Sequence, residues 1–418
     1  MSRNILNNTF EEFCIKTNYS YLPKESQGFI LDIFENFNFS FQQFKQIIDF
    51  ELDFLMWNEK TLNDIFNPKL YKNKKQAFEF IRNIWQKYKK IPNDYESFEG
   101  IKYKNDKKIS FEKTPKETLA LGACPVASEN TRCCNLLTLD SFESCAFDCS
   151  YCSIQSFYTQ GKIGYDEDFN AKLKKIKLDS SKTYHIGTGQ SSDSLLWGNQ
   201  FSHLEALFSF ARNNPNLILE FKTKSKNIKY FLENLVPKNI ICTWSLNTPI
   251  IIKNEEHLSA SLEQRLSCAK ALSDKGILVG FHFHPMIVYK DYLQDYSKVF
   301  TRVQELFTPS QVAMVSFGTL TFIKPVISKL RQRQMKSKIL EFEFFEINKK
   351  SSYSLELKKQ MFKHAYDSFK SWHNKVYFYL CMEDKNLWNE VFGFEYSSND
   401  DMEEAMKNAY FSKISKLV

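Results

Sequence analysis

The sequence predicts an α/β fold, a partial (β/α)6 barrel that follows an N-terminal helical region and precedes a C-terminal α+β extension. Strand-like and helix-like segments alternate from Thr131 to about residue 336, the pattern of a parallel sheet with crossover helices. Apolar residues before this stretch recur at helical spacing. Polar residues follow several strands, at the edge where such barrels hold their sites. We therefore expect three parts, 1–115, 116–340 and 341–418.

Composition limits the class of protein. The 418 residues are 43% hydrophobic, and 56 Lys and Arg against 49 Asp and Glu give a net charge of +7, which permits contact with nucleic acid. Ten cysteines without a secretory signal indicate a reducing compartment and metal or redox use. These cysteines lead us to expect a cytoplasmic protein. No run of eighteen apolar residues occurs, so we expect no membrane segment.

The first part has helical periodicity, as in Phe29, Ile30, Ile33 and Phe34. Segment 86–118 is polar and is expected to be a linker or surface loop. Its lysines include Lys87, Lys89, Lys90, Lys102, Lys104, Lys107 and Lys108.

Six βα units follow. Strands are expected near 135–140, 183–189, 217–224, 240–247, 277–287 and 312–322. The helices between and after them are expected at 166–176, 203–212, 228–235, 261–275, 291–307 and 325–336. A helix at 355–372 and a strand at 376–381 then form the extension, which we expect to pack against the open side of the barrel.

Several predicted strands end in polar residues. The second ends in Gly187–Asp193, where two glycines let the backbone approach a ligand, although ordinary tight turns look the same. The next three end in Lys222–Lys224, Ser245–Asn247 and His282–Pro285. Their shared placement favours a functional site.

Cys145, Cys149 and Cys152 have C-x3-C-x2-C spacing and follow the first strand. Four thiolates normally saturate an iron–sulfur cubane, so three leave one iron open to another ligand. This spacing is that of the radical AdoMet (S-adenosyl-L-methionine) enzymes. A structural zinc site, or three buried packing thiols, are the other interpretations, but zinc sites favour four closed ligands.

From Cys124 to Gly393 the chain resembles the spore photoproduct lyase-like family of radical AdoMet enzymes. The resemblance is carried by Cys133-Cys134, Cys145–Cys152, His185–Leu195, Gly280–Pro285, Ser316–Phe322 and Tyr379–Glu383. It implies a [4Fe–4S] cluster on Cys145, Cys149 and Cys152, with AdoMet on the open iron. Reductive cleavage would give a 5′-deoxyadenosyl radical that abstracts hydrogen from the substrate.

The resemblance also implies which residues bind AdoMet. Lys224 would suit the methionine carboxylate, and Asp193 a ribose hydroxyl or the amino group. The whole implied set is Tyr151, Ser192, Asp193, Lys224 and Ser245, with Gly187, Gly189 and His284 beside them. An electron donor such as flavodoxin or ferredoxin is the implied partner.

One position departs from the family. In spore photoproduct lyase a cysteine after the second strand returns a hydrogen to the product radical, and Gln190 stands there in this chain. Cys381 is the predicted catalytic substitute, with a buried packing thiol as the alternative. Cys133 and Cys134 are expected to line the site, to bind metal with Cys124, or to pack in the core.

The expected function is a lyase-like radical reaction in the repair of photodamaged DNA. Basic residues at the barrel mouth and on the last helix of the barrel would contact phosphates, unless they form a solvated face. They are Lys222, Lys226, Lys229, Lys329, Arg331, Arg333, Lys336 and Lys338. Two alternatives stay open: the same chemistry on RNA, a peptide or a small molecule, and an iron–sulfur nucleic-acid-binding protein without catalysis.

Overall fold

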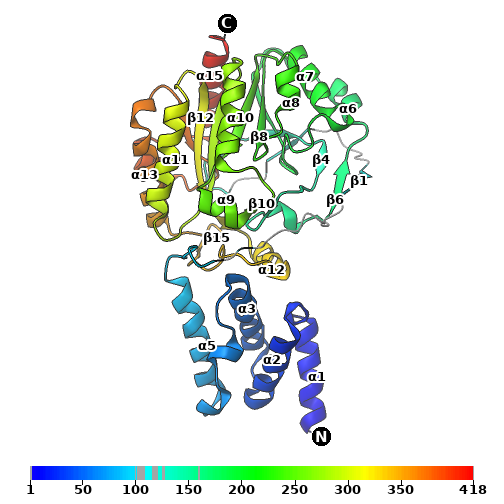
Figure 1. Cartoon of the computed structure of the whole chain (residues 1–418), viewed down its shortest axis with the longest axis vertical. Coiled ribbons are helices and arrows are strands. Elements are labelled where there is room, and N and C mark those ends of the chain that lie inside the picture. Colours follow the sequence, from blue (N-terminus) through cyan, green and yellow to red (C-terminus); the bar gives the residue numbers. More distant parts are fainter. Residues whose placement is uncertain are drawn as a thin grey trace. The chain divides into compact units, whose positions relative to one another are not determined.

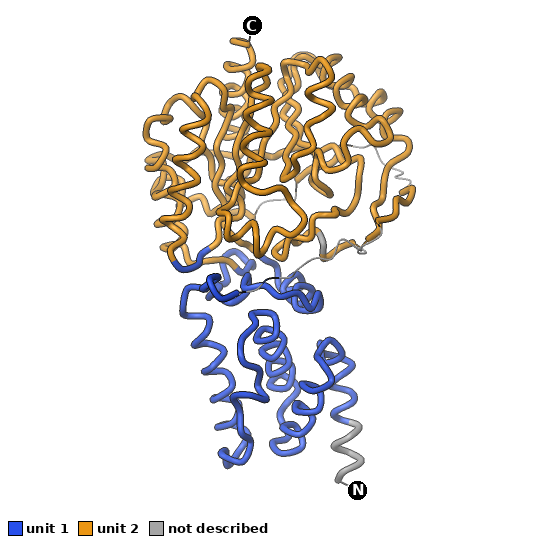
Figure 2. Tube along the Cα trace, in the orientation of Figure 1, with its two compact units in different colours: residues 1–102, 288–290, 322–351 blue, residues 103–287, 291–321, 352–418 orange. Residues whose placement is uncertain are grey.

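The chain forms two compact units in a computed structural model that describes residues 2–98, 100, 109–114, 121–124, 128–158 and 161–417 (Figure 2). Unit 1 comprises residues 1–102, 288–290 and 322–351, and unit 2 comprises 103–287, 291–321 and 352–418. Lys102, Lys104, Lys107 and Lys108 of the expected linker lie outside the described residues. The boundaries expected near 115 and 340 stay a prediction, since compactness groups residues 322–351 with the N-terminal helices.

Unit 1 is helical, as the sequence predicts. α3 begins at a capping box of Ser40 and Gln43 and ends at Asn58, whose left-handed backbone stops the helix. It buries Phe44, Ile47 and Phe54 among its neighbours. The helices are α1 (Ser2–Ile15), α2 (Lys24–Phe37), α3 (Phe41–Trp57), α4 (Leu62–Ile65), α5 (Lys74–Lys89) and α12 (Lys324–Gln332).

A buried ion pair joins two helices of unit 1. Arg331 on α12 donates two hydrogen bonds to the Asp53 carboxylate on α3, at 2.7 and 2.8 Å. Trp85 donates its indole hydrogen to the same carboxylate. Lys338, another basic residue expected to contact phosphates, pairs with Glu59 and Glu341. Arg331 and Lys338 are therefore engaged inside the protein.

The core of unit 2 is a curved eight-stranded sheet, ordered β16-β12-β11-β9-β8-β7-β3-β2. All neighbours pair in parallel except β2, which runs antiparallel to β3. The strands are β2 (Leu121–Ala123), β3 (Leu137–Leu139), β7 (Tyr184–Thr188), β8 (Leu217–Thr223), β9 (Ile240–Ser245), β11 (Leu278–Met286), β12 (Val312–Thr319) and β16 (Tyr377–Leu380). The six predicted strands are confirmed, and the extension adds β16 as a seventh parallel strand.

Helices lie around this sheet (Figure 1). Those at the predicted places are α6 (Phe169–Lys175), α7 (His203–Asn213), α8 (Lys229–Glu233), α10 (Leu262–Asp274), α11 (Tyr292–Leu306) and α13 (Leu355–Ser368). α9 (Pro249–Glu255), α14 (Asn386–Phe392) and α15 (Asn399–Ile414) were not predicted. On α15, Tyr410 is fully buried with its ring edge-on to His185 of β7, so this helix covers the sheet face that carries His185.

Short strands position the loops. β5 (Asp148–Cys149) pairs with β10 (Glu256–His257), and β6 (Lys162–Tyr165) lies between β1 (Ser110–Lys113) and β4 (Phe142–Glu143). β13 (Thr321–Phe322), β14 (Phe345–Ile347) and β15 (Lys350–Ser352) lie between β12 and α13 in the sequence. No helix among the described residues is long and apolar enough to cross a membrane.

The two edges of the large sheet approach each other. Arg132, before β3, donates its backbone hydrogen to Glu383, which follows β16, at 3.3 Å. Lys385 donates in return to the carbonyl of Asn130 at 2.8 Å, and Thr131 pairs with Asp384. These bonds hold the residues before the first parallel strand against those after the last.

Replacing Arg331 by Ala should lower the free energy of unfolding of unit 1. The Asp53 side chain is only 1% exposed, and removing one partner of a buried ion pair costs about 3–5 kcal/mol. Urea denaturation followed by tryptophan fluorescence measures the loss. Lys329→Ala, an exposed change on the same helix, is the control, and equal stability of the two variants would contradict the prediction.

Candidate active site

A cavity of about 230 Å³ lies at the carboxyl ends of β7, β8 and β9, and we call it the strand-end cavity. It brings together the cysteine loop and the polar residues that follow three strands. Its lining includes Cys145, Phe147, Cys149, Cys152, Gly189, Gln190, Ser192, Asp193, Lys222, Lys224 and Ser245. Seven of these residues, from Gly189 to Ser245, are distant in sequence from the cysteines and meet them where the sequence predicts a site.

Backbone pairing fixes the cysteine loop. Cys149 lies opposite Glu256 in the β5–β10 pair, and Ser150 donates its backbone hydrogen to the Glu255 carbonyl at 2.8 Å. Burial raises the pKa of the Cys149 thiol to about 12, with further contribution from Glu256. Burial also raises the pKa of Cys145. Iron binds thiolates, so a bound cluster would offset this cost of ionisation.

Glu256 connects the cysteine loop to the barrel. Tyr151 donates its hydroxyl hydrogen to the Glu256 carboxylate at 2.5 Å, and Arg265 pairs with it at 2.6 Å. Arg265 also donates to the carbonyl of Ser245, at the end of β9, at 2.8 Å. The Lys224 ammonium lies 5.7 Å from the centre of the Tyr151 ring. These buried contacts hold the loop, β9 and Lys224 in one arrangement.

Asp193 shapes the wall of the strand-end cavity. Its carboxylate accepts hydrogen bonds from the Thr223 hydroxyl at 2.6 Å and from the Lys224 backbone at 2.7 Å. It also accepts from the backbones of Leu195 and Leu196. Burial raises the pKa of Asp193, and these hydrogen bonds oppose that rise. The observed bonds thus fix the loops after β7 and β8, and the predicted contact with AdoMet stays a prediction.

Gly189 lies where the backbone turns at the end of β7. Its φ is +79°, and a Cβ there would lie 2.4 Å from the Ser194 hydroxyl. Only glycine fits this turn, which presents the backbone of residues 189–192 to the cavity.

Three residues of the predicted set lie elsewhere. Tyr151 is buried beside Glu256 and does not line the strand-end cavity. Gly187 lines the adjoining cavity described next. His284 lies against Gly318, where a Cβ would be 2.7 Å from its ring, and burial lowers its pKa, with Lys222 adding to the effect.

A second, smaller cavity of about 80 Å³ adjoins the first, and we call it the thiol cavity. Gly189, Gln190 and Lys222 line both cavities. The others that line the thiol cavity include Cys124, Cys133, Cys134, Cys381, His185, Gly187, Glu220 and His282. The predicted catalytic residue, Cys381, is thus one of four thiols in this cavity, and burial raises its pKa to about 12.

Sequence reasoning missed the polar group at the base of the thiol cavity. Glu220 of β8 lies 2.8 Å from Nε2 of His185 and 2.8 Å from Nε2 of His282. It also accepts a hydrogen bond from Thr243 at 2.7 Å. The signal was a charged residue within the otherwise apolar strand 217–221.

In the described part of the chain, the possible metal-binding side chains are not arranged around a single ion. Throughout the described residues, no three His, Cys, Asp or Glu side chains converge closely enough to hold one metal ion. Cys145, Cys149 and Cys152 instead line the wall of one cavity. This arrangement fits a cubane cluster, because each thiolate binds a different iron of the cluster.

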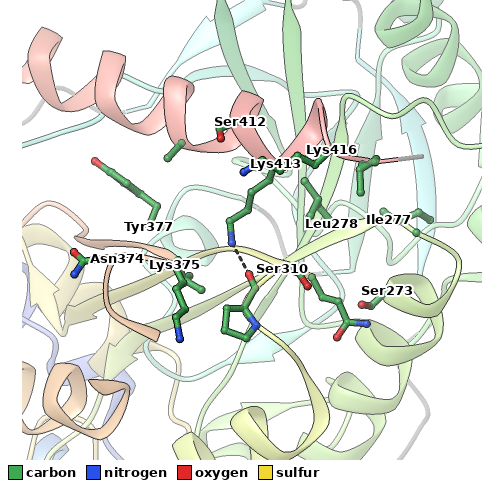
Figure 3. Close-up of a pocket in the computed structure, with 16 residues that line it drawn as sticks. Ser273, Ile277, Leu278, Ser310, Asn374, Lys375, Tyr377, Ser412, Lys413 and Lys416 are labelled. Atoms are coloured by element: carbon green, nitrogen blue, oxygen red, sulfur yellow. Dashed lines mark hydrogen bonds between the residues drawn. The ribbon is translucent and has the colours of Figure 1, made fainter. Parts of the chain in front are cut away.

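A larger cavity, of about 870 Å³, opens at the amino ends of β11, β12 and β16 (Figure 3). Lys413 of α15 crosses it and donates to the carbonyl of Pro309 (Figure 3). None of the cysteines or strand-end residues lines it, so we do not consider it the site. In barrels of this kind chemistry lies at the opposite, carboxyl ends of the strands.

The chain is similar to a curated spore photoproduct lyase from Clostridium acetobutylicum. The two are 22% identical over 166 residues, which is 38% of this chain and 49% of that protein. The match therefore spans about half the length of this relative.

Solved structures share the fold. A spore photoproduct lyase mutant with bound AdoMet and dinucleoside spore photoproduct has a TM-score of 0.55 at 17% identity, covering 69% of this chain and 88% of that one. Another, complexed with dinucleoside spore photoproduct, has a TM-score of 0.53 at 18% identity, covering 65% and 82%. The model of the family described as spore photoproduct lyase matches residues 76–370. The chain therefore belongs to the spore photoproduct lyase family.

Proposed function

We propose that this protein is a radical AdoMet enzyme of the lyase type that acts on photodamaged DNA. The observation that carries the proposal is the strand-end cavity, where Cys145, Cys149 and Cys152 meet the polar ends of β7, β8 and β9. Family membership supports the same chemistry. The two solved structures named above bind dinucleoside spore photoproduct, which supports a DNA lesion as substrate.

The residues divide the work as follows. Cys145, Cys149 and Cys152 would hold a [4Fe–4S] cluster with one iron left open. When bound, the cluster and AdoMet would supply a 5′-deoxyadenosyl radical. The cavity residues with hydrogen-bonding groups would hold AdoMet: Gly189, Ser192, Asp193, Lys224 and Ser245.

Several features of the chain position these groups. Lys224 carries the positive charge that a methionine carboxylate requires, and Asp193 fixes the Lys224 backbone. Tyr151 and Phe147 are buried beside the cysteines, so they exclude water from the cluster side of the cavity. Gly187 and His284, also implied in AdoMet binding, lie outside the cavity wall and stay predictions. A cytoplasmic location and an electron donor such as flavodoxin or ferredoxin belong to the same proposal.

The hydrogen-return step is where this chain differs from its family. Gln190 lines both cavities but has no weak S–H bond to give. Cys381, across the thiol cavity, stays the predicted donor. A different substrate, such as RNA, a peptide or a small molecule, is the second candidate, and Gln190 is the observation that favours it. A cluster protein without catalysis fits less well, because a structural cluster needs no AdoMet pocket.

The cluster at the strand-end cavity should depend on Cys149. Cys149→Ala removes one of three thiolates, so about four irons per chain should be lost after anaerobic reconstitution, together with the AdoMet-induced change in the EPR spectrum. Cys268→Ala, on α10 and outside both cavities, is the matched control. A Cys149→Ala protein that keeps its iron and its response to AdoMet would refute the assignment.

AdoMet affinity should depend on Lys224. A hydrogen bond to a charged group contributes about 1.5–3 kcal/mol, so Lys224→Ala should raise the Kd for AdoMet roughly 10- to 150-fold. Lys226→Ala, an exposed change two residues along the same loop, should leave the Kd unchanged. Equilibrium binding to the reconstituted protein measures both, and equal Kd values would show that Lys224 does not contact AdoMet.

The substrate proposal is tested with DNA that contains the spore photoproduct. A lyase of this family should form 5′-deoxyadenosine and recover thymine, and both products are measured by chromatography. Thymine recovery that disappears in Cys381→Ala would support Cys381 as the hydrogen donor, whereas unchanged recovery would exclude it. 5′-Deoxyadenosine formation that is independent of the lesion, without thymine, would favour the second candidate substrate class.

A further inference from the structure

We propose that Cys124, Cys133, Cys134 and Cys381 hold a second iron–sulfur cluster in the thiol cavity. All four thiols line this one cavity, although they come from three separate segments of the chain. The proposal goes beyond the proposed function, which needs only the three cysteines of the strand-end cavity. Four cysteines are the number that saturates a [4Fe–4S] cluster.

The fold brings these cysteines together at the closure of the curved sheet. Cys124 follows β2, Cys133 and Cys134 precede β3, and Cys381 follows β16. β2 and β16 are the two opposite edges of the eight-stranded sheet. Backbone hydrogen bonds between residues 130–132 and 383–385 hold these two edges together, and this brings the four thiols into one cavity.

Each segment is fixed by its own backbone bonds. The Cys124 backbone donates to Leu136 at 2.9 Å, and that of Cys381 donates to Phe317 at 2.8 Å. The Cys133 backbone donates to the side-chain oxygen of Asn399 at 3.1 Å. Asn135 then takes a left-handed φ of 49°, so the chain turns directly after Cys134. Ligands held on rigid elements suit a metal cluster.

The thiol cavity is lined by one ammonium, Lys222, and one carboxylate, Glu220, which is hydrogen-bonded to two histidines. A cluster bound by four thiolates carries net negative charge, and Lys222 lines the cavity with no charged partner found for it among the described residues. The His185 side chain is 2% exposed, and its Nδ1 has no hydrogen-bond partner in the described part of the chain. Its other nitrogen bonds Glu220. A ligand in the cavity that His185 lines would supply a partner for this buried nitrogen.

The four thiols line one cavity, but they do not converge on a single point as zinc ligands do. Zinc draws its four ligands to one point, and no three such side chains in the described residues converge in that way. Cubane ligands bind separate irons and stay further apart. The three thiols of the strand-end cavity likewise line one cavity without converging on a single point.

The proposal also assigns Cys381 a different role from the one predicted from the sequence. A thiolate bound to iron has no S–H bond, so Cys381 cannot both ligate a cluster and return a hydrogen atom. The two roles therefore exclude each other, and the EPR spectrum of the second cluster with and without Cys381 decides between them without any assay of activity.

The test counts iron and sulfide in protein reconstituted anaerobically. The parent protein should bind about eight irons per chain. A triple variant, with Cys145→Ala, Cys149→Ala and Cys152→Ala, should keep about four irons and as many sulfides, with the EPR signal of a reduced cluster. Adding Cys381→Ala should change this EPR signal, because one iron loses its thiolate, and adding Cys133→Ala and Cys134→Ala as well should remove the irons. Adding Cys268→Ala should do neither.

Three results would overturn the proposal. The first is a folded triple variant without iron, and the second is zinc as its only metal. The third is an unchanged EPR signal of the second cluster in the variant that also carries Cys381→Ala, which would return Cys381 to the hydrogen-donor role. If the triple variant fails to fold, the parent protein decides, since about four irons per chain would refute a second cluster. In that case the first cluster and the proposed function would still stand.

Discussion

The interior of the curved sheet depends on one buried carboxylate. Glu220 on β8 binds His185 of β7, Thr243 of β9 and His282 of β11, so one side chain joins four adjacent strands. Burial opposes its ionisation, but hydrogen bonds from the two histidines hold the pKa of Glu220 well below its usual range. An apolar residue here would leave His185, Thr243 and His282 without their partner, which costs more than the lost bonds alone. Glu220, His185 and His282 all line the thiol cavity.

Much of the fold could be predicted because most of its helices and strands have a clear pattern of apolar residues in their own segment of the sequence. β8 and β11 are apolar runs between helices with regular spacing, and all six predicted strands exist. α15 was missed although Met402, Met406 and Tyr410 recur every four residues, because the charged residues between them conceal an apolar stripe that faces the sheet. The pairing of β5 with β10 has no local signal, since its two strands are two residues each and lie far apart in sequence.

The grouping of the site residues could be predicted, but their individual roles could not. Three thiols at fixed spacing predict a cluster loop, and all three line one cavity with the strand-end residues. In the sequence, a carboxylate that contacts a ligand looks the same as one that fixes a loop. For Asp193, only the four hydrogen bonds in the folded structure show that it fixes the loops. Glu256 and Arg265 lie nine positions apart, yet their link to Tyr151 and Ser245 requires the folded loop. The grouping of Cys381 with Cys124 depends on the curvature of the sheet.

Because residues after β16 close the sheet, the two cavities form at different times during synthesis of the chain. A chain is made from its amino end, and its parts can fold as they emerge. The residues that line the strand-end cavity, and those up to Arg265 that fix its cysteine loop, are all made well before Cys381. The thiol cavity gains its last wall only after β16 joins the sheet. Under the proposed cluster assignments, iron would therefore meet the first set of cysteines while the second set is still incomplete.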